Sequence, residues 1–143
     1  GTRVILDPAP ARALPDSLLA KVSLATPNET EAELLTGVAG EDEASCAKQA
    51  EILKSKGVRT VLVTRGKNGV LCRDSSGVRH FPTVAVKSVD STAAGDCFNG
   101  GLGAALARGE SLEAAIAFAS RAAAISTTRL GAQDSLPYLK DVE

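Results

Sequence analysis

The sequence predicts an α/β fold in which a mostly parallel β-sheet is flanked by helices and extended by an antiparallel hairpin. Two observations carry this prediction. Along the first 64 residues, short apolar or β-branched runs alternate with segments of helical periodicity, as in layered α/β proteins. Further on, two strand-like runs flank the turn residues Asp74–Gly77, which is the pattern of a hairpin. Ligands of such folds bind beyond the carboxyl ends of the parallel strands.

The strands are expected where short runs are apolar or β-branched. Val4–Leu6 is continuously apolar, as in a strand covered on both faces, and the prolines at positions 8 and 10 end it. Thr60–Thr64 is the strongest strand by β-propensity. The other expected strands are 23–25, the hairpin strands 70–72 and 78–81, and 85–88.

The helices are expected where apolar residues recur at spacings of three and four and capping residues precede them. The first is 15–22, with Leu18, Leu19 and Val22 facing inward. The others are one that opens within 26–33 and ends near Gly37, 42–56, one through 98–106, and 112–126 after Ser111.

Composition excludes several classes of function. The 143 residues carry 16 basic and 17 acidic side chains and only 3% aromatics, so nothing indicates a nucleic-acid partner. No apolar run has the length of a membrane span, and no signal peptide opens the chain. The three cysteines are far apart, as in a cytoplasmic protein with reduced thiols. The absence of methionine and the early first strand suggest a fragment.

Residues 89–101 combine a strand-like approach, a turn of small residues and the start of a helix. The first N–H groups of a helix attract anions, and Ala93, Ala94 and Gly95 leave room for a phosphate. Asp96 places a carboxylate beside that position, where it could accept a proton from an attacking hydroxyl. The alternative is that Asp96 only caps the helix. A P-loop is excluded, because Gly101-Leu102 stands where that motif has Lys and Ser or Thr.

Three further segments have both a structural and a functional interpretation. Asn28 and Glu31 have the spacing of a capping box, but their oxygens also suit magnesium. The turn Arg65–Gly69 either starts a hairpin or brings backbone close to a nucleotide. The polar stretch 127–135 is an ordinary loop or a site for a monovalent cation. The segments at 28, 64–69 and 90–96 all follow expected strands, so we expect them to gather at one sheet edge.

Residues Asp90–Gly100 resemble the signature D-T-x-A-A-G-D-x-F-x-G of the ribokinase-like (PfkB) carbohydrate kinases. Three other segments, 7–11, 26–33 and 128–133, resemble segments of the same family in the same order. Cys97 departs from the family, which usually has a small hydroxyl residue at this position. We interpret this cysteine as structural.

The resemblance implies a role for particular residues. Asp96 would be the base that deprotonates the sugar hydroxyl, and the N–H groups of Ala93, Ala94, Gly95 and Asp96 would form the anion hole. Asn28 and Glu31 would organise magnesium and phosphate. The residues implied to contact ATP are Thr64, Gly66, Gly69, Gly95 and Ser120, the last beside the adenine. The residues implied to surround potassium are Asp90, Thr92, Ser126, Arg129, Gly131 and Ser135.

The resemblance further implies a ribokinase-like layered fold in which residues 1–143 are the C-terminal ATP-binding and catalytic portion. The parent protein would use ATP, Mg²⁺ and K⁺ to phosphorylate the primary hydroxyl of a sugar, giving ribose 5-phosphate from ribose. The sugar-binding residues and the dimerisation lid of a cytoplasmic homodimer would precede this segment, so the isolated chain is expected to be inactive. The alternatives are a sibling sugar or nucleoside kinase and a noncatalytic nucleotide-binding module. A dinucleotide-binding oxidoreductase is a weaker alternative, because no G-x-G-x-x-G follows an early strand.

Overall fold

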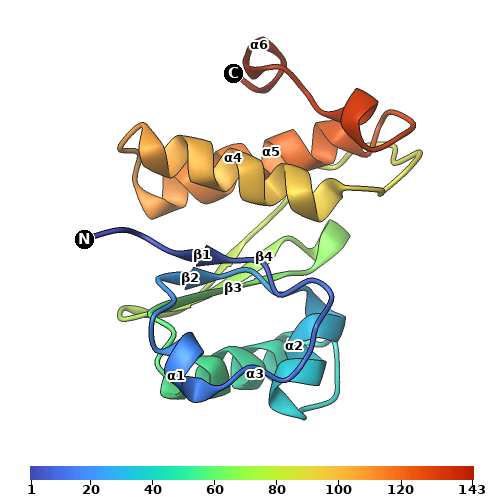
Figure 1. Ribbon diagram of the computed structural model, residues 1–143. Helices are drawn as coiled ribbons and strands as arrows, with labels where there is room; N and C mark the ends of the chain where they lie inside the picture. Colours follow the sequence, from blue (N-terminus) through green and yellow to red (C-terminus); the bar gives the residue numbers. More distant parts are fainter. The chain divides into compact units, whose positions relative to one another are not determined.

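The computed structural model describes all residues from 1 to 143. The chain forms two compact units, Gly1–Phe81 and Pro82–Glu143 (Figure 1). None of its helices combines the length and the hydropathy that a bilayer crossing requires.

The first unit is a five-stranded mixed sheet with its helices on one side (Figure 1). The strand order follows the sequence, with the first three strands parallel and the last two antiparallel, as expected. The strands are β1 (Ile5–Leu6), β2 (Leu24–Ala25), β3 (Thr60–Thr64), β4 (Val70–Asp74) and β5 (Gly77–Phe81). The helices are α1 (Asp16–Leu19), α2 (Glu29–Thr36), α3 (Glu43–Ser55) and the 3₁₀ turn η1 (Gly66–Asn68).

The core of this unit lies between the sheet and its helices. Val61 and Val63 of β3 and Leu71 of β4 pack with Leu53 of α3, and all four are fully buried. The backbone of Ala20 lies close to Gly57, which follows α3. At Gly57 φ is +108°, and an added Cβ would lie 2.7 Å from Ala20 Cα. Only glycine fits both the conformation and the space.

The second unit is built on two helices packed side by side (Figure 1). They are α4 (Ala94–Ala107) and α5 (Leu112–Ser126), followed by the 3₁₀ turn η2 (Gln133–Ser135) and the short helix α6 (Leu139–Val142). Small residues allow close contact, since an added Cβ at Gly101 would lie 3.2 Å from Ala119 Cα. Ser111 caps α5 as predicted, with its Oγ accepting the Ala114 N–H at 3.2 Å.

One predicted element is wrong, and another is shorter than predicted. Residues 85–88 form no strand, because no other strand pairs with them, and they are exposed. β-Propensity alone cannot make a strand without a hydrogen-bonded neighbour. The helix expected over 15–22 has only the four residues of α1, and Leu18 is 42% exposed although Leu19 and Val22 are buried as predicted.

Candidate active site

The start of α4 has an unusual geometry. Ala93 precedes the helix with φ +61° and ψ 14°, and it is the one residue other than glycine with a positive φ. No side chain caps this helix end. The Ala94 N–H donates to the Ser91 carbonyl at 3.1 Å, whereas the N–H groups of Gly95 and Asp96 have no acceptor in the protein. Space beside Gly95 is open. The helix therefore presents two unpaired donors.

Asp96 lies in the first turn of α4 and is exposed. It is not the N-cap, and its carboxylate accepts no hydrogen bond from the chain, so the interpretation of Asp96 as a helix cap is wrong. Its negative charge still interacts favourably with the positive end of the helix dipole. The carboxylate is thus free to accept a proton from a bound molecule.

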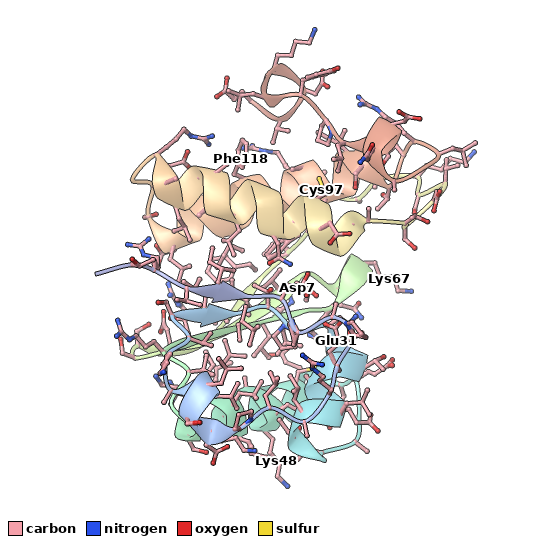
Figure 2. The ribbon with its side chains drawn as sticks, in the orientation of Figure 1. Asp7, Glu31, Lys48, Lys67, Cys97 and Phe118 are labelled. Carbon is pink, nitrogen blue, oxygen red and sulfur yellow. The ribbon has the colours of Figure 1, made fainter.

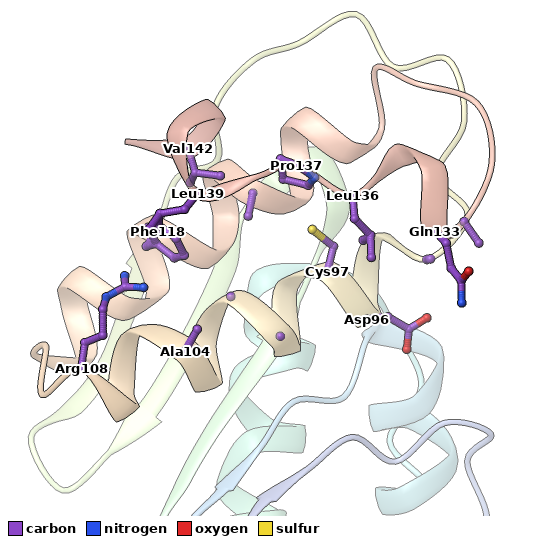
Figure 3. A pocket seen from close by; sticks show the side chains of 15 residues that line it. Asp96, Cys97, Ala104, Arg108, Phe118, Gln133, Leu136, Pro137, Leu139 and Val142 are labelled. Atoms are coloured by element: carbon purple, nitrogen blue, oxygen red, sulfur yellow. The ribbon is translucent and has the colours of Figure 1, made fainter.

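A cavity of about 490 Å³ extends from this helix start along α4 (Figure 3). Asp96 and Gln133 lie at one end, and Arg108 lies at the other, with its guanidinium 4.7 Å from the centre of the Phe118 ring. Arg108 also donates to Glu110 through Nε and Nη2, so its charge is neutralised. The other lining residues are mainly small or apolar, including several of the C-terminal segment.

Cys97 lines the same cavity, with its sulfur toward the C-terminal segment at Pro137 (Figure 3). The residue is only 8% exposed. Burial raises the pKa of the Cys97 thiol, and a hydrogen bond with Ser126 opposes this only in part. The thiol is therefore protonated at neutral pH, which agrees with a structural role.

The segment before α4 is joined to the segment after α5 by the carboxylate of Asp90. One oxygen accepts the N–H of Thr92 at 2.9 Å and its hydroxyl at 2.6 Å, and the other accepts the Gly131 N–H at 3.0 Å. These hydrogen bonds, that of the Thr92 hydroxyl first, lower the pKa of Asp90. The N–H groups of Val89 and Asp90 both donate to the Thr127 carbonyl, at 2.7 and 3.1 Å.

The remaining residues that the sequence placed around a cation lie in this same unit. Ser126 and Ser135 are fully buried, and their hydroxyls donate to the Ala123 and Ala132 carbonyls at 2.8 and 2.7 Å. Arg129 approaches Asp141, with 3.5 Å between Nη2 and Oδ2. No group of three His, Cys, Asp or Glu residues in the chain could hold a metal.

In the first unit, Asn28 and Glu31 form the predicted capping box at the start of α2. Figure 2 labels Glu31 on this helix. Asn28 Oδ1 accepts the Glu31 N–H at 2.8 Å, and Glu31 Oε2 accepts the Asn28 N–H at 2.8 Å. The structural interpretation of this pair is therefore confirmed. The second carboxylate oxygen of Glu31 and the Asn28 amide nitrogen have no partner in the chain, so a ligand role is compatible with the cap.

The turn after β3 lies next to this pair. Asn28 and Thr64 form an isolated parallel bridge, and the Thr64 N–H donates to the Pro27 carbonyl at 2.9 Å. The turn joins β3 to antiparallel β4, so its interpretation as the start of a hairpin is confirmed. Gly66 and Gly69 have φ of +50° and +80°, and space beside Gly66 is open. Two of the three predicted ligand-binding segments thus meet at one sheet edge.

Comparison with known proteins identifies the chain. The family model described as pfkB family carbohydrate kinase matches residues 1–139. The chain belongs to the pfkB family. It is 47% identical over 137 residues to a ribokinase of Haemophilus influenzae, covering 96% of this chain and 45% of that protein. It is 36% identical over 141 residues to a deoxyribokinase of Salmonella typhi, covering 98% of this chain and 46% of that protein.

A solved structure supports the same assignment. The structure of Arabidopsis thaliana ribokinase complexed with ribose and ATP matches with a TM-score of 0.93 and 32% identity, over 99% of this chain and 46% of that chain. The chain therefore spans about half the length of the pfkB proteins that it matches. The ribokinase-like layered fold expected from the signature is confirmed.

Three other polar side chains of this pfkB chain lie at or near residues predicted to bind ATP. Ser120 on α5 is 6% exposed, and its hydroxyl has no hydrogen-bond partner. His80, to which the sequence assigns no role, lies within 2.7 Å of the Asn68 carbonyl through Nε2 and so contacts the turn after β3. Arg65 is buried in the same turn and approaches Glu29. These contacts join residues 12 and 36 positions apart, so no local sequence pattern could indicate them.

Proposed function

We propose that this chain is the ATP-binding and catalytic portion of a kinase that transfers the γ-phosphoryl group of ATP to the primary hydroxyl of ribose. The observation that carries the proposal is the start of α4. There an exposed carboxylate, Asp96, stands in the same helical turn as two N–H groups without acceptors, those of Gly95 and Asp96. Membership of the pfkB family and the names of the relatives support the same reaction.

The chemistry follows from these groups. Asp96 accepts the proton of the sugar 5-hydroxyl while that oxygen forms a bond to the γ-phosphorus, and the bond from phosphorus to the ADP oxygen breaks. The N–H groups of Gly95 and Asp96 donate to the phosphoryl oxygens as charge develops on them. The Ala94 N–H would join them only by giving up its bond to the Ser91 carbonyl. The products are ribose 5-phosphate and ADP.

The turn after β3 is one segment proposed to contact the nucleotide. Space beside Gly66 is open, so a nucleotide would have access to the backbone there, with Thr64 at the start of the turn. Gly69 is buried, and its N–H and carbonyl are bonded within the turn. The buried Ser120 hydroxyl lacks a partner, and a buried polar group of this kind usually has one. A nucleotide base bearing donors and acceptors would satisfy it.

Magnesium and potassium fit the oxygen groups that are present. Glu31 retains one carboxylate oxygen outside the capping box, and a Mg²⁺ ion held partly through water suits such a ligand. Bound magnesium would neutralise charge on the ATP phosphates. For potassium, the available groups are hard oxygens: the Asp90 carboxylate, the Thr92, Ser126 and Ser135 hydroxyls and nearby carbonyls. Arg129, paired with Asp141, would contribute its carbonyl.

A second candidate is phosphorylation of a related sugar, which the similarity to a deoxyribokinase favours. We also propose a homodimeric, cytoplasmic parent protein, and the three free cysteines agree with a reducing compartment. A noncatalytic nucleotide-binding role is the alternative for the 143 residues alone.

The test compares two sugars and two forms of the protein. ADP release by the full-length protein is measured with ribose and with 2-deoxyribose, and ATP is titrated into the 143-residue chain by calorimetry. Faster turnover with ribose supports the proposal. Faster turnover with 2-deoxyribose contradicts it and supports the second candidate, phosphorylation of a related sugar. No turnover of either sugar by the full-length protein would overturn the proposal, and ATP binding by the 143-residue chain would then support the noncatalytic alternative.

A further inference from the structure

Arg65 lies between two residues of the proposed nucleotide turn, Thr64 and Gly66, yet its side chain does not extend into solvent. The residue is only 8% exposed. Charged side chains are rarely buried unless they are paired, because desolvation of the charge is costly. The burial of Arg65 therefore indicates that its partners hold it in a defined position.

Those partners belong to two other segments of the first unit. Arg65 Nε lies 3.4 Å from Glu29 Oε1, and Nη2 donates to the Glu41 carbonyl at 3.1 Å. Glu29 is the first residue of α2 and follows Asn28 directly, while Glu41 belongs to the connection between α2 and α3. Only 20% of the Glu29 side chain is exposed. Solvent and salt therefore weaken the attraction between Arg65 and Glu29 less than they would at the surface. One guanidinium thus connects the turn after β3 to both ends of the segment that contains α2.

The backbone of the same residue closes the turn. The Arg65 N–H donates to the Gly69 carbonyl at 2.8 Å, and the Asn68 N–H donates to the Arg65 carbonyl at 2.8 Å. Main-chain pairing already joins Thr64 to Asn28 and Pro27, but it stops at Thr64. Beyond Thr64, the turn is joined to the start of α2 by the side chain of Arg65, through its ion pair with Glu29.

We propose that Arg65 is a positioning residue, whose ion pair with Glu29 holds the Thr64–Gly69 turn at a fixed spacing from Asn28 and Glu31. The inference rests on the proposed function, since these two segments are the ones assigned to nucleotide and magnesium. Arg65 itself does not contact the nucleotide. It fixes two ligand-binding segments before the ligand arrives, which lowers the ordering cost of binding.

The experiment uses the full-length protein with Arg65→Leu, Arg65→Lys and the double substitution Arg65→Leu/Glu29→Leu. The double variant removes the uncompensated Glu29 charge and so separates positioning from stability. The matched control is Arg73→Leu, which removes another ion pair of the first unit, that of Arg73 Nε with Glu51 Oε2 at 2.6 Å, between β4 and α3. We measure kcat, the KM for Mg·ATP, the KM for ribose and the melting temperature.

For Arg65→Leu and for the double variant we expect the KM for Mg·ATP to rise about tenfold, because energetic coupling between contacting residues is of this size. The KM for ribose should change little. Arg65→Lys keeps the charge and should recover part of the loss. Arg73→Leu should leave the KM for Mg·ATP unchanged. An unchanged KM in the double variant, or a rise equal to that of Arg73→Leu, would overturn the proposal.

Amide hydrogen exchange without ligand separates this inference from the proposed function. If Arg65 positions the turn, the amides of Arg65 and Gly69 exchange faster in the double variant than in Arg73→Leu at equal melting temperature. Equal exchange in the two variants contradicts positioning whether or not the protein phosphorylates ribose. If exchange is faster in the double variant but the protein transfers no phosphoryl group, the positioning role of Arg65 stands. Only the proposed kinase function is then refuted.

Discussion

The Asp90 carboxylate accepts the backbone N–H of Gly131 at 3.0 Å, across 41 positions of the sequence. Two further hydrogen bonds, from the Thr92 N–H and hydroxyl, occupy its other oxygen. Asp90 therefore joins the segment that enters α4 to the loop that leaves α5. This loop is also the one assigned to the monovalent cation, so its order matters for the proposed function.

Replacing this carboxylate should loosen both segments. In Asp90→Ala, the Thr92 and Gly131 N–H groups lose their acceptor, and their amide hydrogens should exchange faster. The hydrogen bonds lower the pKa of Asp90 below 3.8, so its contribution to stability is present above that pH and is lost as pH falls through the folded-state pKa. Asp134→Ala is the control, because that carboxylate accepts no hydrogen bond from the chain. Equal exchange in both variants would contradict the role of Asp90.

Asp96→Asn in the full-length protein should reduce kcat by about 10²-fold or more, the contribution of a positioned general base. The melting temperature and the affinity for ATP should change little, because the side chain is exposed and bonds to nothing in the chain. Steady-state kinetics and an ATP titration check the two parts. Unchanged turnover would remove Asp96 from the catalytic role.

Cys97 should make the protein less stable in alkali. Burial raises its pKa above the ordinary value of 9.0, so the unfolded chain ionises first. The stabilisation is complete below pH 9 and is lost as pH rises through the folded-state pKa. Urea unfolding at several pH values should therefore show a shallower loss of stability above pH 9 in Cys97→Ser. Parallel pH curves for the two proteins would contradict this linkage.

Two neighbouring glycines of α4 should respond in opposite directions. Gly101→Ala places a Cβ 3.2 Å from Ala119 Cα and should destabilise the protein by about 1–3 kcal/mol through overpacking. Gly100→Ala meets no atom within 4 Å and should stabilise it by about 1 kcal/mol through helix propensity. Urea unfolding of both variants measures the difference, and destabilisation of similar size in both would contradict close packing at Gly101.

Local patterns predicted the elements that local interactions determine. The hairpin around Asp74–Gly77, the Ser111 cap and the capping box of Asn28 and Glu31 all involve residues close in sequence, and each was found. The strand expected over 85–88 was not, because strand formation depends on a partner that propensity does not reveal.

The same distinction applies to the candidate site. The glycine-bounded turn after β3 and the small residues before Asp96 were evident from the sequence, but the strand expected ahead of Asp96 is absent. The interpretation of Asp96 as a helix cap was plausible from its neighbours and wrong, since Ala93 occupies the N-cap position. The Arg65–Glu29 pair joins residues 36 apart and produces no periodicity, so only the three-dimensional structure exposes it.

The left-handed conformation of Ala93 affects the stiffness of the loop that enters α4. An alanine in the left-handed region is strained by roughly 1–2 kcal/mol, and glycine would relieve that strain. Glycine would also widen the range of shapes open to the loop, at the point where the helix meets its proposed anion. Alanine at position 93 therefore gives this helix a stiffer entrance than glycine would, and a β-branched residue there would be strained more than either.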